Sequence, residues 1–294
     1  MKRIGFVGLG HMGLPMAINL VKAGYTVMGF DLQTPAMDNL VAAGGLRAKT
    51  IEDIAHQDII ITMLQTGQQV QNVCLGPQGI FKLAPKNILY IDCSSIDVES
   101  SRKLHQTAQE QGHIAVDAPV SGGEAGAKAG TLTIMVGGAE QAFEQAKPIL
   151  HHVGKKIIHT GIAGTGQAAK ICNNMILGIS MIAISEAFSL AKHLHLTPQK
   201  LFEVVTNSSG QCWAMNQYVP VPGILENVPA NRNYQPGFTA AMMLKDLCLS
   251  QHTAETIGVK TDMGEKATAL YQKLNDEGMS NLDFSAIIKI IDTH

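Results

Sequence analysis

Short apolar runs rich in β-branched residues alternate with helical patterns over the first half of the chain. Asp58–Met63 (DIIITM) and Asn87–Asp92 (NILYID) are almost continuously apolar, which is typical of parallel strands buried on both faces. Further strands are predicted over Ile4–Val7, Tyr25–Phe30, His113–Asp117 and Leu132–Val136, and helices over Met12–Ala23, Ser100–Gln111 and Ala139–Leu150. This alternation predicts a parallel sheet with right-handed crossovers.

The pattern changes at the glycine-rich segment Gly161–Gly166, after which strand signals almost vanish. Helices are predicted over Gln167–His193, Thr239–Thr256 and Asp262–Glu277, and an extended loop over Tyr218–Phe238. We therefore predict an α/β protein with two domains. Residues 1–162 form a Rossmann domain with a doubly wound parallel sheet, and residues 163–294 form an all-α domain.

Composition and charge narrow the class of protein. Hydrophobic residues make up 46% of the chain, which is enough for a large core, and the formal net charge of -2 argues against a nucleic-acid partner. The apolar run Met175–Ile184 is too short to span a bilayer and is followed by Glu186, so no membrane association is predicted. The first strand starts directly after Arg3, which leads us to expect a cytoplasmic protein.

The cysteines and histidines give no sign of a metal site. The five cysteines are odd in number and none lies in a Cys-x-x-Cys pair, so we expect reduced, mostly buried thiols. The histidines show no spacing typical of zinc ligands, so we predict that the protein has no metal site.

The segment Gly8-Leu9-Gly10-His11-Met12-Gly13 follows a predicted strand and opens a predicted helix. In that context the first glycine permits a tight turn, the second lets the backbone approach a pyrophosphate, and the third allows close packing of helix on strand. The helix N-terminus then offers free N–H groups to the phosphates. The alternative is a glycine turn that binds no nucleotide.

Asp31 ends the second predicted strand, close to the position about 20 residues on where an acidic residue binds a ribose 2′-hydroxyl. A carboxylate there repels the additional phosphate of NADP, and no arginine follows within residues 32–39. The pattern therefore predicts NAD as the cofactor.

Four segments, in this order, resemble the 3-hydroxyisobutyrate dehydrogenase family of β-hydroxyacid dehydrogenases. They are Gly8–Leu20, Asp117–Gly138 (DAPVSGGEAGAKAGTLTIMVGG), Gly164–Asn174 (GTGQAAKICNN) and Leu244–Leu247 (LKDL). Three further segments, Ser208–Trp213, Val219–Gly223 and Asn233–Phe238, resemble the hydroxyisobutyrate branch more than the reductases of tartronate semialdehyde.

Lys170 and Asn174 lie four residues apart and share one face of a predicted apolar helix. Partial burial of a lysine lowers its pKa and makes it a usable proton donor and acceptor, whereas the alternative is a lysine whose charged end stays in water. The family resemblance implies that Lys170 is the catalytic acid and base. It implies that Asn174, otherwise a helix-packing asparagine, bridges Lys170 and substrate.

Substrate and cofactor contacts are also implied by the resemblance. Ser121, Gly122 and Gly123 would bind the substrate carboxylate; from the residues alone, an ordinary glycine turn is the alternative. The implied cofactor contacts beyond the glycine turn and Asp31 are Leu64, Gln65, Gln69, Ser95, Phe238 and Lys245. Gln65 stands where the family often has proline, and Ser95 where it usually has threonine. Without the resemblance, Lys245 beside Asp246 would be read as a solvated pair.

The resemblance implies NAD-dependent oxidation of 3-hydroxyisobutyrate to methylmalonate semialdehyde, a step of valine breakdown, in a homodimer or homotetramer. The small 3-hydroxy acid would bind in a cleft between the two domains. Two alternatives stay open: a reductase of another small semialdehyde, such as tartronate semialdehyde, and a non-catalytic NAD-binding protein. Loss of the lysine would mark the latter, and Lys170 is present.

Overall fold

A computed structural model describes residues 2–292 of the chain. The chain folds into two compact units, Met1–Lys170 and Ile171–His294. The division falls inside helix α9 (Thr165–His193), whereas the sequence pattern placed a boundary between residues 162 and 163. The first turns of α9 belong to the first unit because they are hydrogen-bonded to its strands.

The first unit is built on one sheet. Its strands are β1 (Arg3–Val7), β2 (Thr26–Phe30), β3 (Leu46–Arg47), β4 (Ile59–Thr62), β5 (Leu89–Asp92), β6 (Ile114–Asp117), β7 (Val120–Ser121), β8 (Leu132–Gly137) and β9 (Gly154–Gly161). They lie in the order β3-β2-β1-β4-β5-β6-β8-β7, and β9 pairs with β8. The predicted parallel sheet is confirmed from β3 to β6.

The sheet is mixed beyond β6, which the sequence pattern did not predict. β8 runs antiparallel to both β6 and β7, and only its pairing with β9 is parallel. β3 and β7 are two residues long, too short to show an alternating pattern. The second and third residues of β9 are the exposed Lys155 and Lys156, so its sequence lacks the apolar run that marked the buried strands.

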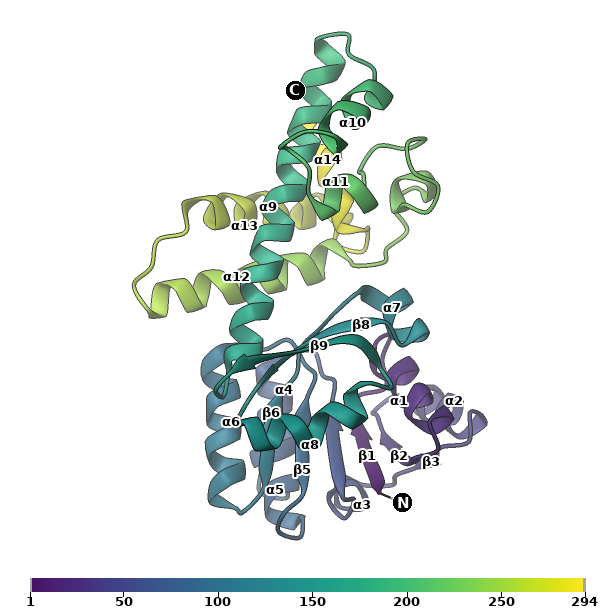
Figure 1. Cartoon of the computed structure of the whole chain (residues 1–294), viewed down its shortest axis with the longest axis vertical. Helices are drawn as coiled ribbons and strands as arrows, with labels where there is room; N and C mark the ends of the chain where they lie inside the picture. The colour runs from purple at the N-terminus through teal and green to yellow at the C-terminus, as the bar shows by residue number, and fades with distance from the viewer. Residues whose placement is uncertain (1, 293–294) are drawn as a thin grey trace. The chain divides into compact units, whose positions relative to one another are not determined.

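Helices cover both faces of the sheet (Figure 1). They are α1 (Gly13–Lys22), α2 (Thr34–Ala42), α3 (Ile51–Ala55), α4 (Gly67–Leu75), α5 (Ile80–Leu83), α6 (Val98–Glu110), α7 (Gly123–Ala129) and α8 (Glu140–Leu150). Successive residues of β4 face opposite sides: Ile59 and Ile61 pack in one core with Met16 of α1, and Ile60 packs in the other with Val70 of α4. The predicted doubly wound arrangement is therefore confirmed.

The second unit is all-helical, as predicted. It contains the remainder of α9 together with α10 (Pro198–Thr206), α11 (Trp213–Gln217), η1 (Pro229–Arg232), α12 (Ala240–Thr256), α13 (Asp262–Leu274), η2 (Asn275–Met279), η3 (Phe284–Ile287) and α14 (Ile288–Ile291). Its core contains Met181 of α9, Met243 and Leu247 of α12, and Tyr271 of α13. The Tyr271 hydroxyl donates a hydrogen bond of 3.1 Å to the carbonyl oxygen of Phe284, which joins the last segment to this core.

Helix α9 and the cysteines bear on two expectations drawn from composition. Among the described residues, α9 has the length and apolar character to cross a membrane, with 29 residues and an 18-residue window of mean hydropathy 1.5. A core helix can satisfy the same criterion, and Met181 and Phe188 of α9 are buried in the second unit. The expectation of mostly buried thiols is wrong, because Cys172 and Cys248 occupy exposed positions on α9 and α12, and only Cys74 and Cys93 are buried.

Candidate active site

The turn between β1 and α1 has the geometry that its glycines predicted. Gly8 has φ of 94°, and an added Cβ there would collide with the carbonyl oxygen of Met63. A Cβ at Gly13 would collide with the carbonyl oxygen of Gly8, whereas a Cβ at Gly10 would meet nothing within 4 Å among the described residues. The fold itself therefore requires Gly8 and Gly13, while Gly10 borders space through which a phosphate can reach the backbone.

The N-terminus of α1 is suited to bind an anion. Met12 is the N-cap residue, and its side chain makes no hydrogen bond to this end of the helix. Among the described residues, no acidic side chain lies in the first turn of α1. The positive end of the helix dipole favours a phosphate at such a terminus. The residues of this turn therefore fit the pyrophosphate of a dinucleotide.

Asp31 links the end of β2 to the glycine turn. Its Oδ2 accepts a hydrogen bond of 2.7 Å from the backbone N–H of Leu9, and its Oδ1 accepts one of 2.8 Å from the N–H of Gln33. Each carboxylate oxygen has two lone pairs, so both can still accept a ribose hydroxyl. The carboxylate is thus fixed at the place where the sequence predicted ribose recognition.

The loops after β4 and β5 are tied to each other. The N–H of Leu64 donates to Oγ of Ser94 at 2.9 Å, and Ser95 follows directly in the chain. The N–H of Gln65 donates to Oε1 of Gln69 at 3.0 Å, so part of the Gln69 side chain holds its own loop. These loops follow the carboxyl ends of neighbouring parallel strands, where ligands bind in sheets of this type.

The segment predicted to bind the substrate carboxylate lies against the glycine turn. Ser121 ends β7, Gly122 has φ of 135°, and Gly123 begins α7. Glu124, the next residue, has its Oε2 3.3 Å from Nδ1 of His11 in the glycine turn. Lys128 and His11 together hold the pKa of the Glu124 carboxyl below its ordinary value, with the Lys128 hydrogen bond as the larger cause. The first unit therefore brings the predicted cofactor and substrate segments together.

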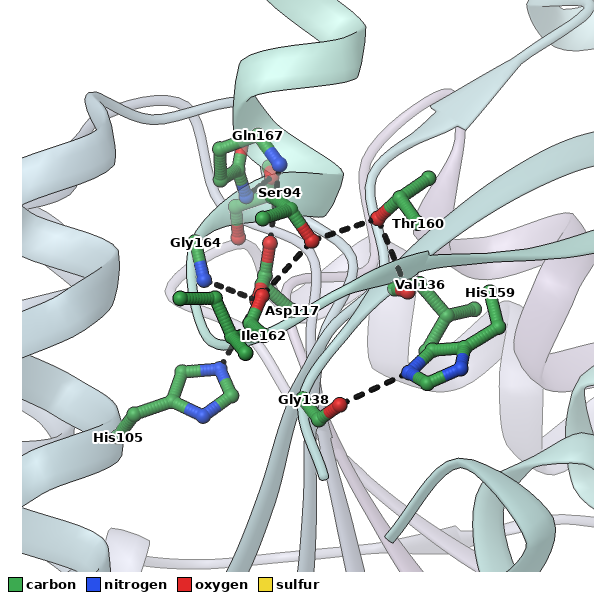
Figure 2. A network of polar contacts seen from close by, with 11 residues as sticks. Ser94, His105, Asp117, Val136, Gly138, His159, Thr160, Ile162, Gly164 and Gln167 are labelled. Carbon is green, nitrogen blue, oxygen red and sulfur yellow. Dashed lines mark hydrogen bonds and ion pairs between the residues drawn. The ribbon is translucent and has the colours of Figure 1, made fainter. Parts of the chain in front are cut away.

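Asp117 fixes the start of α9, and sequence reasoning did not single it out. Its Oδ1 accepts a hydrogen bond of 2.8 Å from the N–H of Gly164, and its Oδ2 accepts one of 2.9 Å from the N–H of Gln167 (Figure 2). Nε2 of His105 lies 3.0 Å from Oδ1 of the same carboxylate. A buried carboxylate thus accepts hydrogen bonds from two N–H groups at the start of the helix that carries Lys170, which is only 8% exposed.

Asn174, one turn beyond Lys170, belongs to a polar cluster of the second unit. Its Nδ2 donates a hydrogen bond to the carboxylate of Asp246 on α12, and its Oδ1 accepts one of 2.9 Å from Asn173. Nζ of Lys245 lies 3.3 Å from the other carboxylate oxygen of Asp246. The Lys245–Asp246 pair therefore has a buried carboxylate and a half-buried lysine, and is not the solvated pair that residue patterns alone would suggest.

Phe238 is held by a second buried carboxylate that the sequence did not reveal. Oδ2 of Asp283 accepts hydrogen bonds from the N–H groups of Gly237 and Phe238, at 3.0 and 3.2 Å, and from the hydroxyl of Tyr218 at 2.9 Å. Its other oxygen accepts two bonds from Ser285. Asp283 therefore fixes the backbone at Phe238, although it lies far along the chain.

Asp92 is a buried acid behind the loop that contains Ser94. Its Oδ1 accepts hydrogen bonds of 2.8 Å from the Thr62 hydroxyl and 3.0 Å from the N–H of Ser94. Its Oδ2 is buried and has no hydrogen-bond partner among the described residues. Burial raises the pKa of Asp92 to about 6. Asp92 pairs in register with Asp117 of β6, and the negative charge of Asp117 adds a smaller upward effect.

The fold and the glycine turn are those of a protein that binds a dinucleotide. Residues 3–161 match the family described as the NAD binding domain of 6-phosphogluconate dehydrogenase. Residues 164–291 match the family described as NAD-binding of NADP-dependent 3-hydroxyisobutyrate dehydrogenase. The chain belongs to the 3-hydroxyisobutyrate dehydrogenase family of β-hydroxyacid dehydrogenases, as its sequence resemblance implied.

Three similar proteins illustrate the relationship. An NAD-dependent L-serine dehydrogenase of Pseudomonas aeruginosa is 45% identical over 99% of this chain and 98% of its own. A probable mitochondrial 3-hydroxyisobutyrate dehydrogenase of Dictyostelium discoideum is 43% identical over 97% of this chain and 89% of its own. The structure of the Mycobacterium tuberculosis 3-hydroxyisobutyrate dehydrogenase with L-serine is 43% identical, with a TM-score of 0.94 over 99% of both chains.

Proposed function

We propose that this protein oxidises 3-hydroxyisobutyrate to methylmalonate semialdehyde with NAD, and that Lys170 is its acid and base. The observation that carries the proposal is the placement of Lys170, a buried lysine in the first turns of a helix whose start is fixed by Asp117. Relatives named 3-hydroxyisobutyrate dehydrogenase, at 40–44% identity across most of the chain, support 3-hydroxyisobutyrate as the substrate.

The reaction removes a hydride from C3 of the hydroxy acid and a proton from its hydroxyl group, which leaves an aldehyde. When bound, NAD supplies the hydride acceptor. Lys170 accepts the hydroxyl proton, directly or through a water, and returns it in the reverse direction, while Asn174 bridges Lys170 and substrate by hydrogen bonds. Ser121, Gly122 and Gly123 bind the substrate carboxylate through the serine hydroxyl and backbone N–H groups, which fixes C3 for transfer.

Preference for NAD over NADP is part of the proposal and depends on Asp31. Its carboxylate, fixed by Leu9 and Gln33, would face the ribose hydroxyls and repel a 2′-phosphate. The second matching family carries NADP in its description, whereas the Pseudomonas relative is named as NAD-dependent. Leu64, Gln65, Gln69, Ser95, Phe238 and Lys245 complete the proposed cofactor contacts.

L-serine is the second candidate substrate. It shares the carboxylate and the primary C3 alcohol of 3-hydroxyisobutyrate, and carries an ammonium group at C2 in place of the methyl group. The 45% identical relative is named for serine oxidation, and the Mycobacterium structure contains L-serine. A site formed to hydrogen-bond the ammonium rejects the methyl analogue strongly, whereas an apolar site discriminates by one methyl group far less.

The deciding experiment measures NADH formation with 3-hydroxyisobutyrate, L-serine and the hydroxyl-bearing acids related to tartronate semialdehyde, with NAD and with NADP. We expect the highest kcat/KM with 3-hydroxyisobutyrate and NAD. A higher kcat/KM with serine or a hydroxyl-bearing acid would support the proposed reaction class but show that 3-hydroxyisobutyrate is not the preferred substrate. Lys170→Ala should lower kcat by about 100-fold or more, the scale of general acid–base catalysis.

The matched control is Lys192→Ala, which removes a lysine of the same helix. Lys192 is exposed and lies 2.7 Å from Asp292 in a surface ion pair, far along α9 from Lys170. We expect this variant to retain the wild-type rate. A Lys170→Ala variant that also retained the rate would remove Lys170 from the chemistry.

A further inference from the structure

Gln167 is a fully buried glutamine in the first turn of α9, and both ends of its side-chain amide are occupied. Its Nε2 donates a hydrogen bond of 2.7 Å to the carbonyl oxygen of Ser94, and its Oε1 accepts one of 3.2 Å from the N–H of Ile96. These two bonds, which we call the amide clamp, hold the backbone on each side of Ser95. Figure 2 shows Gln167 above Ser94 at the start of the helix.

The backbone of Gln167 is fixed separately from its side chain. Its N–H donates to Asp117 at the end of β6, while its side chain reaches the segment after β5. β5 and β6 are neighbouring parallel strands, and Asp92 pairs in register with Asp117. The first turn of α9 is thus attached to two adjacent strand ends through one residue.

The amide clamp needs a side chain that both donates and accepts at this length. A glutamate would still accept from the N–H of Ile96, but would place an oxygen against the carbonyl oxygen of Ser94. A methionine has a similar length and can make neither hydrogen bond at comparable strength. Gln167→Glu therefore removes one of the two hydrogen bonds of the amide clamp, and Gln167→Met removes both.

Lys170 lies three residues after Gln167, so the two side chains are neighbours on the helix surface, and both are buried. Ser95 is the proposed contact on the nicotinamide side, and Lys170 the proposed acid and base. Because Gln167 is in the same helix turn as Lys170, its hydrogen bonds to the backbone around Ser95 also fix the distance between Ser95 and that turn.

We infer that Gln167 is a positioning residue of the dehydrogenase reaction, which acts by holding Ser95 and Lys170 in one fixed arrangement through the amide clamp. The inference rests on the proposed function for the roles of those two residues. The clamp itself is a property of the protein without ligands, and it can be measured in that state.

The first test measures amide hydrogen exchange at Ile96 in the free protein. In Gln167→Met we expect exchange at least about tenfold faster than in wild type, because the N–H loses its acceptor. In Gln167→Glu, which keeps an acceptor, we expect a smaller acceleration. Unchanged protection of Ile96 in Gln167→Met would overturn the clamp. Gln57→Met is the matched control, since Gln57 is a buried glutamine whose Nε2 donates to the Asp53 carbonyl oxygen at 2.8 Å.

The second test measures turnover per site, with sites counted by NADH titration. For Gln167→Met we expect kcat per site to fall by about tenfold or more, since misplacement by 1 Å can cost about 100-fold. KM for the hydroxy acid should change less, and the primary isotope effect with substrate deuterated at C3 should increase because hydride transfer becomes slower. Gln167→Glu should lie between wild type and Gln167→Met, and Gln57→Met should match wild type.

The outcomes separate this inference from the proposed function. If Gln167→Met loses activity only in proportion to its lost NADH sites, with an unchanged isotope effect, Gln167 is structural and the inference is wrong. If the wild-type protein oxidises none of the hydroxy acids, the proposed function fails, and the exchange rate at Ile96 still decides whether the clamp exists.

Discussion

The side-chain amide of Asn174 donates a hydrogen bond to the carboxylate of Asp246, which joins α9 to α12 inside the second unit. Both residues are almost fully buried, at 2% and 3% exposed. The Asp246 carboxylate accepts a hydrogen bond and the Asn173 amide donates one, so the amide nitrogen of Asn174 faces Asp246 and its oxygen faces Asn173. The proposed role of Asn174 therefore depends on a residue that lies 72 positions away in the chain.

We predict strong energetic coupling between Asn174 and Asp246. Asn174→Ala should lower the free energy of unfolding by about 1–3 kcal/mol, because it removes a hydrogen bond to a buried carboxylate. In a double-mutant cycle with Asp246→Ala, the coupling energy should exceed about 1 kcal/mol. The surface pair Lys192–Asp292 provides a control cycle with an expected coupling below about 1 kcal/mol. Additive effects of Asn174→Ala and Asp246→Ala would contradict the prediction.

Removal of the charge at Asp31 should shift cofactor preference. Asp31→Asn keeps the size of the side chain but loses the repulsion of a 2′-phosphate, which is about 1 kcal/mol at 4 Å even in water. We expect the ratio of kcat/KM with NADP to that with NAD to rise by about tenfold or more. Asp38→Asn is the control, because Asp38 forms an exposed ion pair with Arg47 at 3.0 Å. Equal ratios in Asp31→Asn and wild type would exclude the carboxylate as the selector.

Alanine substitutions at two glycines of the same turn should have different effects, one on stability and the other on cofactor binding. Gly13→Ala places a methyl group against the Gly8 carbonyl oxygen, so thermal unfolding should show destabilisation of about 1–3 kcal/mol. Gly10→Ala meets no atom within 4 Å and should leave the melting temperature unchanged while weakening NADH binding. A Gly10→Ala protein that bound NADH as tightly as wild type would place the pyrophosphate elsewhere.

The buried carboxyl of Asp92 should make stability depend on pH. Its pKa is raised from 3.8 to about 6 by burial, so the folded state holds this proton more tightly than the unfolded state. The stabilisation is fully present below pH 3.8 and is lost as the pH rises to about 6. We expect the difference in unfolding free energy between wild type and Asp92→Asn to decrease over that interval in denaturant titrations. Parallel pH profiles of the two proteins would show that Asp92 is not the group responsible.

Local patterns predicted the parts of the site that depend on local backbone geometry. The glycine turn and Asp31 lie where the residue pattern placed them, because each follows directly from a strand end, whereas the contacts in the loops after β4 and β5 were implied by the family resemblance. The strands β3, β7 and β9 were missed, because the first two are only two residues long and β9 has exposed lysines near its start. The antiparallel course of β8 depends on pairing partners that no local pattern specifies.

The anchoring residues of the site could not be predicted from local patterns. Asp117 reads as an ordinary strand end, and its role depends on the N–H groups of Gly164 and Gln167. Asp283 lies 45 residues from Phe238, whose backbone it holds. In the sequence, Asp117 and Asp283 each appear only as an acidic residue beside apolar neighbours, and this pattern does not indicate which N–H groups the carboxylate binds.

The bonds at the start of α9 also constrain the order of folding. They connect residues 47, 50 and 73 positions apart in the chain, so each closes a long loop. α9 can form its own helical bonds early, but its first turn cannot dock until β5 and β6 have joined the sheet. We therefore expect Lys170 to reach its buried position only in a late step of folding, and a chain arrested earlier would contain α9 without the proposed site around Lys170.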